Sequence, residues 1–179
     1  MLGLPRVYPR KHSLTAAGAC ALAAAALAGC GGGSGQASGR TVRGPGFRFQ
    51  APSSWHVRRQ GSEVQAGPGP TSPELVSVSV FPLVHPYKPS LWTAAGRELD
   101  GDARQLAERL GGAVKTSATV RLGGAKAHQY ELGYRGGGQD YHERIMFLLR
   151  GKTEYELLCR WTGGEPSACA QLERTFRPG

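Results

Sequence analysis

The sequence predicts an α+β domain in which an antiparallel sheet packs against helices. Segments that alternate apolar and polar residues occur on both sides of one long stretch with helical periodicity. Short connections that contain glycine join the later alternating segments, which is typical of hairpins in an antiparallel meander. Strands, a helix, further strands and a closing helix together indicate the α+β class.

The first 29 residues have the pattern of a secretion signal. Arg6, Arg10 and Lys11 form a basic start, and an apolar run rich in Ala and Leu covers residues 14–27. A transmembrane helix is the first alternative, but residues 14–29 number only 16, whereas a span needs about 20 apolar residues. Cleavage of an ordinary secretion signal is the second alternative.

The signal ends in Leu27-Ala28-Gly29-Cys30, which resembles a bacterial lipobox. The resemblance implies that the precursor is diacylated on Cys30 and cut between Gly29 and Cys30. Cys20 fits this role poorly, because Ala17 stands three residues before it and the apolar run ahead of it is too short. We therefore expect residues 1–29 to be a lipoprotein signal peptide, and the protein to lie on the extracytoplasmic face of a bacterial cell membrane, held by lipid.

Composition and net charge limit the kinds of partner that we expect this protein to bind. Without residues 1–29 the chain has 150 residues, enough for one domain, with 19 Lys and Arg against 13 Asp and Glu and a net charge of +6. The basic residues are scattered rather than gathered with aromatic residues in one stripe, so we expect no nucleic-acid partner. An anionic lipid or polymer fits the charge, and so does an ordinary solvated surface.

Two cysteines remain for a disulfide. Cys159 and Cys169 stand ten residues apart, on segments that we expect to face the core. In an oxidising compartment such a pair usually bonds, and no histidine has a short spacing to either cysteine that would suggest a metal site. We expect a disulfide, no metal and no cofactor.

Residues 30–45 are expected to be a tether rich in Gly and Ser, followed by a single α+β domain over residues 46–179. Arg40, Arg43 and Arg48 fall near the membrane end of the domain, where anionic headgroups would attract them. The first elements are a strand at residues 47–49, a turn at residues 51–55 and a hairpin around Gly61.

A clear strand and a long helix come next. Residues 75–81 alternate Val with Ser, and apolar residues recur at helical spacing from residue 91 to residue 110. Ser90 is a candidate N-cap, and Gly111 marks the end of the helix. Gly101, between two aspartates, leaves open a break into two helices.

Four strands and a closing helix complete the domain. The strands are expected at residues 114–122, 125–134, 141–150 and 154–161, with the third central in the sheet because its apolar residues occupy both faces. Pro166 lies in the first turn of the last helix, which places Cys169, Leu172 and Phe176 on one stripe.

These features resemble the PsbP-like family of α-β-α sandwiches, which includes small bacterial lipoproteins. The resemblance rests on the segment 47–55 with its Pro-x-x-Trp ending, on the order of the elements, and on the closing Arg174-Thr175-Phe176, and it covers about residues 46–177. It implies helices packed on an antiparallel sheet and a binding or accessory role that is mostly non-enzymatic. It transfers no catalytic residue.

Few residues suggest a site. Tyr87 and Trp92, at the ends of a Pro-rich segment, are candidates for a binding groove, and ordinary packing explains them equally well. His128, His142 and Glu143 are a weak candidate for a metal or acid–base site, because period-two geometry sends His142 and Glu143 to opposite faces. No Gly-x-Ser-x-Gly or phosphate-loop motif occurs.

Three classes of function follow. The first is a non-catalytic lipoprotein with a binding or accessory role in the cell envelope, whose partner is an envelope protein, an anionic polymer or lipid. The second is an envelope hydrolase or a metal-dependent enzyme. The third is a structural or interaction module that keeps a larger complex at the membrane. We expect the first, and so expect no enzymatic activity.

Overall fold

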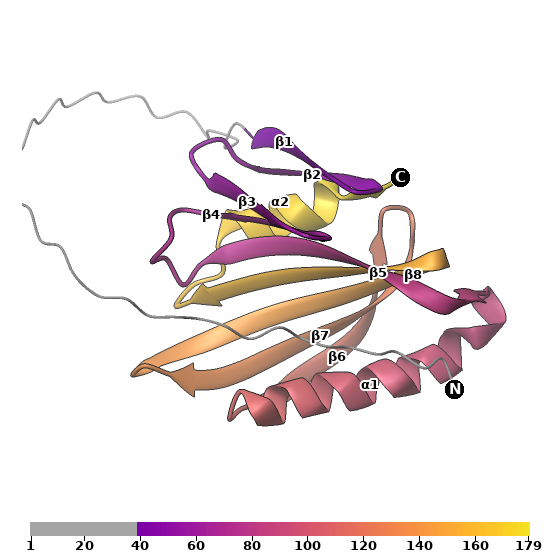
Figure 1. Ribbon diagram of the computed structural model, residues 1–179. Coiled ribbons are helices and arrows are strands. Elements are labelled where there is room, and N and C mark those ends of the chain that lie inside the picture. Colours follow the sequence, from indigo (N-terminus) through magenta and orange to yellow (C-terminus); the bar gives the residue numbers. More distant parts are fainter. Residues whose placement is uncertain (1–38) are drawn as a thin grey trace, which may run out of the picture.

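The computed structural model describes residues 39–179 and arranges them in two antiparallel sheets and two α-helices (Figure 1). The larger sheet has the strand order β3-β4-β5-β8-β7-β6, and a three-stranded sheet has the order β1-β2-β9. The strands are β1 (Gly39–Gly44), β2 (Phe47–Pro52), β3 (His56–Gln60), β4 (Glu63–Gly67), β5 (Leu75–Tyr87), β6 (Ala113–Leu122), β7 (Ala125–Gly136), β8 (Gln139–Thr162) and β9 (Arg177–Pro178). The helices are a short 3-10 turn, η1 (Pro89–Leu91), then α1 (Trp92–Arg109) and α2 (Ser167–Thr175).

Strand β8 doubles back on itself. The rings of His142 and Trp161 stack with centroids 5.6 Å apart, and Arg160 approaches Glu143 to 3.7 Å. In a straight strand, Glu143 and Arg160 would be about 55 Å apart at about 3.3 Å per residue. The chain therefore turns at Gly151, where φ is +56°, and the two arms of β8 lie side by side (Figure 1). This hairpin agrees with the two strands and the turn at residues 151–152 that the sequence predicts.

Helices cover the larger sheet from both sides. Helix α1 packs on β6 and β7 through Leu99, Ala103 and Ala107, which join Ile145 and Phe147 of the first arm of β8 in one apolar cluster. The other face carries the larger core, where α2 and the three-stranded sheet pack on β4, β5 and β8. The predicted antiparallel sheet with helices packed on it is therefore confirmed.

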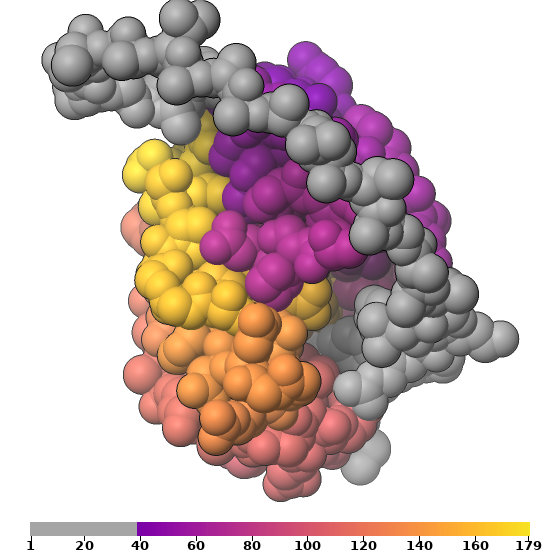
Figure 2. Space-filling view, turned by 90° about the vertical axis from the view of Figure 1, so that its left-hand side faces the viewer, coloured from indigo at the N-terminus to yellow at the C-terminus, as the bar shows by residue number. Residues whose placement is uncertain are grey.

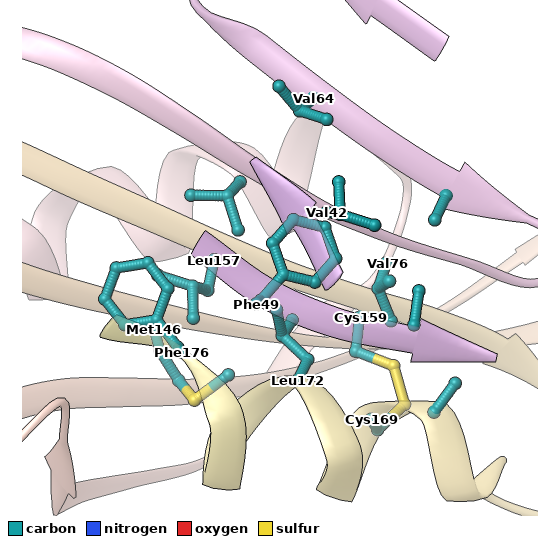
Figure 3. Packing of buried hydrophobic residues seen from close by; sticks show 14 of the residues in the cluster. Val42, Phe49, Val64, Val76, Met146, Leu157, Cys159, Cys169, Leu172 and Phe176 are labelled. Carbon is teal, nitrogen blue, oxygen red and sulfur yellow. A yellow bond between two sulfur atoms is a disulfide. The ribbon is translucent and has the colours of Figure 1, made fainter. Parts of the chain in front are cut away.

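The larger core also holds the cysteine pair (Figure 3). Cys159 of β8 and Cys169 of α2 are joined in a disulfide, with Cα atoms 5.6 Å apart and both residues fully buried. Phe49 of β2 and Phe176 after α2 belong to the same core and are also buried. The disulfide thus joins α2 to the sheet within the core rather than at the surface.

The domain begins earlier than the sequence suggests. Residues 39–44, expected to belong to the tether, form β1 and pair along their whole length with β2. Val42, the one apolar side chain in this strand, is 2% exposed and belongs to the larger core. The segment carries no alternating pattern, and only its pairing with β2 makes it a strand.

Two further elements differ from expectation. Strand β5 continues beyond Phe81 to Tyr87, with an irregular register after Pro82, because proline has no N–H for the ladder. Helix α1 runs without a break through Gly101, since an interior glycine costs only about 1 kcal/mol and the apolar face on either side is buried. Ser90 lies inside η1 and caps no helix with its side chain.

The first and last strands of the described residues, β1 and β9, both pair with β2. Figure 2 shows the N-terminal strands, in indigo and purple, beside the C-terminal segment in yellow. Both apolar clusters, the strand pairings and the disulfide lie within residues 39–179. This segment therefore contains what is needed to fold as one unit. Neither of its helices is long and apolar enough to cross a bilayer.

Candidate functional site

One part of the larger sheet carries polar side chains in two rows. The pairing places Gln60, Glu63, Ser79 and Glu156 opposite one another across β3, β4, β5 and the second arm of β8. Residues that pair directly in an antiparallel sheet share one face. The next row on the same face contains Arg58, Gln65 and Ser77. We call these seven residues the polar sheet face: Arg58, Gln60, Glu63, Gln65, Ser77, Ser79 and Glu156. Ser77 and Glu156 are buried, with 5% and 6% of their surface exposed, so the other five residues form its accessible part.

This face lies on the same side of the sheet as α1. Ser77 pairs with Leu158, and Leu158 packs against the apolar cluster under α1. Within residues 39–179, however, α1 packs on β6, β7 and the first arm of β8, and no helix covers the β3–β5 part of this face (Figure 1). A sheet face that helices cover is normally apolar. The polar residues therefore mark where this sheet lacks a helical layer.

The surface is hollowed at the β3–β4 end. A depression of about 340 Å³ is lined by Arg58, Arg59, Gln60, Glu63 and Gln65. Neighbouring strands lie about 4.8 Å apart, so each row presents hydrogen-bonding groups at a regular spacing. Amide, hydroxyl, carboxylate and guanidinium groups together suit a polar ligand that lies across the strands.

A buried carboxyl lies on the same side of the sheet, near the C-terminal end of α1. Glu143 of β8 is 5% exposed, and Tyr134 of β7 donates its hydroxyl to Glu143 Oε1 at 2.8 Å. Arg160 Nη1 lies 3.7 Å from the same oxygen, and its Nε donates to the Pro73 carbonyl at 3.1 Å. The ring of Tyr141 stacks on Tyr134 with a centroid distance of 5.1 Å.

Burial governs the charge of this group. It raises the pKa of Glu143, and the hydrogen bond from Tyr134 and the positive charge of Arg160 oppose the shift. Burial, together with the negative charge of Glu143, also raises the pKa of the Tyr134 hydroxyl. A general base needs an oxygen that can reach a substrate proton. Tyr134 and Arg160 both contact Oε1 of Glu143, and burial limits access to the carboxyl.

The candidate groove residues Tyr87 and Trp92 lie in different surroundings. Tyr87 lines a cavity of about 10 Å³ between β5 and α1, with Leu83, Leu99 and Leu149 among its walls. That volume accommodates about one water molecule. Trp92 stacks instead on His128, with ring centroids 3.8 Å apart, and Lys126 Nζ lies 5.8 Å from the ring. Trp92 is thus not among the residues that line the cavity beside Tyr87.

The histidines of the weak metal candidate are also apart. His128 lies under α1, where a Cβ on Gly96 would approach it to 2.8 Å, so glycine is needed there. Burial lowers the pKa of His128, and Asp100 opposes this shift. His142 stacks on Trp161 on the opposite face from Glu143. Within residues 39–179, no three His, Cys, Asp or Glu side chains are grouped so as to hold a metal ion.

An arginine surrounded by carboxylates joins the sheet to α2. Arg144 of β8 contacts Glu131 at 2.7 Å, Glu165 at 2.7 Å and Glu173 at 2.9 Å, and its guanidinium lies over the Trp161 ring. Hydrogen bonds to these acids raise the pKa of Arg144 against the effect of burial. The cluster joins the sheet to the segment just before α2, through Glu165, and to the last turn of α2, through Glu173.

Sequence reasoning located some of these residues and missed others. Cys30 and Gly29 lie outside the described residues, whereas Cys159 and Cys169 are bonded as expected. The polar sheet face was missed, although the alternation of Ser77 and Ser79 with valines is visible in the sequence. Its meaning depends on whether a helix covers that side, which alternation alone does not say.

No family model matches the sequence, and neither does any curated protein. Among solved structures, the chain is similar to cyanobacterial PsbP (CyanoP) from Synechocystis sp. PCC 6803, with a TM-score of 0.56 at 15% identity over 86% of this chain and 99% of that one. The fold is PsbP-like. A crystal structure from Bacteroides thetaiotaomicron VPI-5482 has a TM-score of 0.55 at 14% identity over 79% of this chain, which spans 48% of that protein.

A third structure, LpqN, described as involved in cell envelope biogenesis of Mycobacterium tuberculosis, has a TM-score of 0.47 at 12% identity over 78% of this chain and 90% of that one. At these identities the likeness concerns the fold alone. The PsbP-like domain here matches CyanoP over nearly the whole of that chain, so both consist of one such domain over the matched length.

Proposed function

We propose that this protein is an extracytoplasmic accessory protein, held to the membrane by lipid on Cys30, that binds a polar partner through the polar sheet face. It catalyses no reaction in this role. The partner is a component of the cell envelope, either a protein or a polymer, that presents hydrogen-bonding groups along an extended surface.

The observation that carries the binding role is the polar sheet face itself. Its two rows cross strands whose opposite face carries Val64, Val76 and Val78 of the larger core, with Arg59 on the edge strand β3 as a charged exception. A change from apolar to polar within one sheet, limited to the part beyond α1, supports a surface that meets a partner. The depression at β3 and β4 gives such a partner a defined seat.

The sequence supports the anchor. Leu27-Ala28-Gly29-Cys30 closes the basic and apolar signal, and the folded domain begins at Gly39, shortly after it. Two or three acyl chains on Cys30 suffice for stable attachment, at about 0.8 kcal/mol for each buried methylene.

A non-catalytic role is supported by the surroundings of Glu143. The carboxyl is buried, bonded to the Tyr134 hydroxyl and close to Arg160, which explains its raised pKa without a substrate. Perturbed pKa values arise in structural ion-pair networks as well as in active sites.

One experiment in intact cells tests both parts of the proposal. For the anchor, Cys30→Ala is expected to abolish incorporation of labelled palmitate and to release the protein from the membrane fraction. The matched control, Cys20→Ala, is expected to keep both the labelling and the membrane association. For the partner, a photo-crosslinking residue at Gln60 is expected to give a discrete adduct, and the same residue at Ser117 on β6, also exposed, to give none.

The two readouts fail separately. Unchanged palmitate labelling of Cys30→Ala refutes the lipid anchor but does not affect the proposal that the polar sheet face binds a partner. Equal adducts from both crosslinking positions, or none from Gln60, refute the binding face and leave the anchor standing. Turnover of a substrate that Glu143→Gln abolishes would support an enzyme instead.

A further inference from the structure

Arginines form a row across the outer face of the three-stranded sheet. Arg43 of β1 pairs with Arg48 of β2, and Arg48 pairs with Arg177 of β9. Directly paired residues project from the same face, with Cβ atoms about 5 Å apart. The three side chains are exposed, whereas Val42, Phe47 and Phe49 on the other face enter the core. The row therefore points away from the protein.

A fourth arginine joins this row from the larger sheet. Arg59 of β3 donates from Nη2 to the Arg43 carbonyl at 3.5 Å, which brings its guanidinium beside β1. Arg59 pairs with the buried Val64 and is itself exposed. We call these residues, Arg43, Arg48, Arg59 and Arg177, the arginine row.

The charge of the row is not neutralised by neighbouring acids. Within residues 39–179, no carboxylate lies within 4 Å of these guanidinium groups, whereas Arg144 contacts three. Arg177 donates from Nη1 to the carbonyls of Arg174 and Phe176, which leaves its other donors for a ligand. Like charges that face each other across strands destabilise a sheet, so an anion bound here would stabilise it.

The shape and place of the row favour an extended anionic surface. Arg43, Arg48 and Arg177 lie across open strands rather than in a pocket, while Arg59 also lines the depression at β3 and β4. Strand β1 is the first element of the described chain. Residues 30–38 hold β1 within about 30 Å of Cys30, at about 3.4 Å per residue. Attraction to a charged surface falls off within about 8 Å at physiological salt, and a row on the tethered sheet can come that close.

We propose that the arginine row docks on the phosphate headgroups of an anionic membrane, and so orients the domain with the three-stranded sheet toward the bilayer. Guanidinium groups match phosphate oxygens with paired hydrogen bonds. The docking adds an orientation to the proposed anchor, and it is tested without the anchor.

The test uses unlipidated residues 39–179 and sedimentation with vesicles of phosphatidylcholine, with or without phosphatidylglycerol. The protein is expected to bind only vesicles that contain phosphatidylglycerol, and added salt is expected to weaken the binding. Arg48→Gln with Arg177→Gln should lower the partition coefficient about thirtyfold, or about fivefold for each arginine, which corresponds to about 1 kcal/mol per residue near an anionic surface.

The matched control is Arg97→Gln with Arg104→Gln on α1, on the far side of the larger sheet (Figure 1). It removes the same charge and is expected to leave the partition coefficient nearly unchanged. An equal loss in both pairs would mean attraction by net charge without orientation and would overturn the proposal. Equal binding of the unmodified protein to both kinds of vesicle would also overturn the proposal. The same holds if the Arg48 and Arg177 changes weaken binding to soluble polyphosphate but not to vesicles.

Discussion

At the scale of single residues, Glu143 is the most informative side chain, because burial of a carboxyl makes the stability of the protein depend on pH. Tyr134 and Arg160 contact the same oxygen, yet burial outweighs both and raises the pKa of Glu143. The folded protein thus holds the Glu143 proton more tightly than the unfolded chain does. Stability from this group is fully present below the unfolded pKa, about 4.3, and is lost as pH rises through the folded pKa.

Glu143→Gln is therefore expected to gain stability relative to the unmodified protein as pH rises from about 4 to about 7. The neutral amide stays uncharged in the folded state over this range and can still accept the Tyr134 hydroxyl. Urea unfolding at a series of pH values measures the difference. Glu108→Gln, at an exposed position on α1, is the control. The same pH dependence in both variants would contradict the assignment of the effect to burial of Glu143.

At the scale of elements, turns were the most predictable features. Helices and strands whose pattern contains a glycine or a proline were the least predictable. Glycines with positive φ mark the turns at Gly61, Gly123 and Gly137, and hairpins were expected at each of these connections. The break considered at Gly101 does not occur, because burial of Leu99 and Ala103 outweighs the cost of one glycine. The extension of β5 past Pro82 was missed, because proline normally ends a central strand.

The requirement for glycine at a turn with positive φ can be tested at Gly151, inside β8. A Cβ at Gly151 or at Gly69 would meet no atom within 4 Å, but only Gly151 has a positive φ, +56°. Gly151→Ala is therefore expected to lower the free energy of unfolding by about 1 kcal/mol, and Gly69→Ala to leave it unchanged or slightly higher. Urea unfolding of both variants measures this. Equal stability would mean that the backbone at Gly151 carries no conformational requirement.

At the scale of the whole molecule, the structure differs from the prediction at the start of the domain. Residues 39–44 contain Gly, Arg, Thr and a single Val, so no hydrophobic pattern identifies a strand there. In the folded protein Val42 fills part of the core, and Arg40 donates to the Trp55 carbonyl. Contacts such as Arg48 with Arg177 join residues far apart in the chain, and no local pattern reveals them.

A chain of residues 46–179 is consequently expected to be less stable than residues 39–179 by about 2 kcal/mol or more. Burying one valine contributes roughly 1.5–3 kcal/mol, and the loss of β1 also exposes Phe49 and an edge of β2. Val42→Ala in the longer chain, expected to cost about 1–2 kcal/mol, separates the packing from the strand pairing. Equal unfolding midpoints and slopes for the two chains would place the domain start at residue 46 after all.

The position of β2 between β1 and β9 has a practical meaning for anything joined to this protein. The first and last strands of the described chain pair with opposite edges of β2, and the Gly179 N–H bonds the Gly46 carbonyl. A fusion after Gly179 would therefore emerge at the same small sheet as Gly39, away from the polar sheet face. A reporter at that end would measure proximity to the proposed lipid anchor, whereas the exposed turn at Gly137 and Gly138 offers an insertion site remote from it.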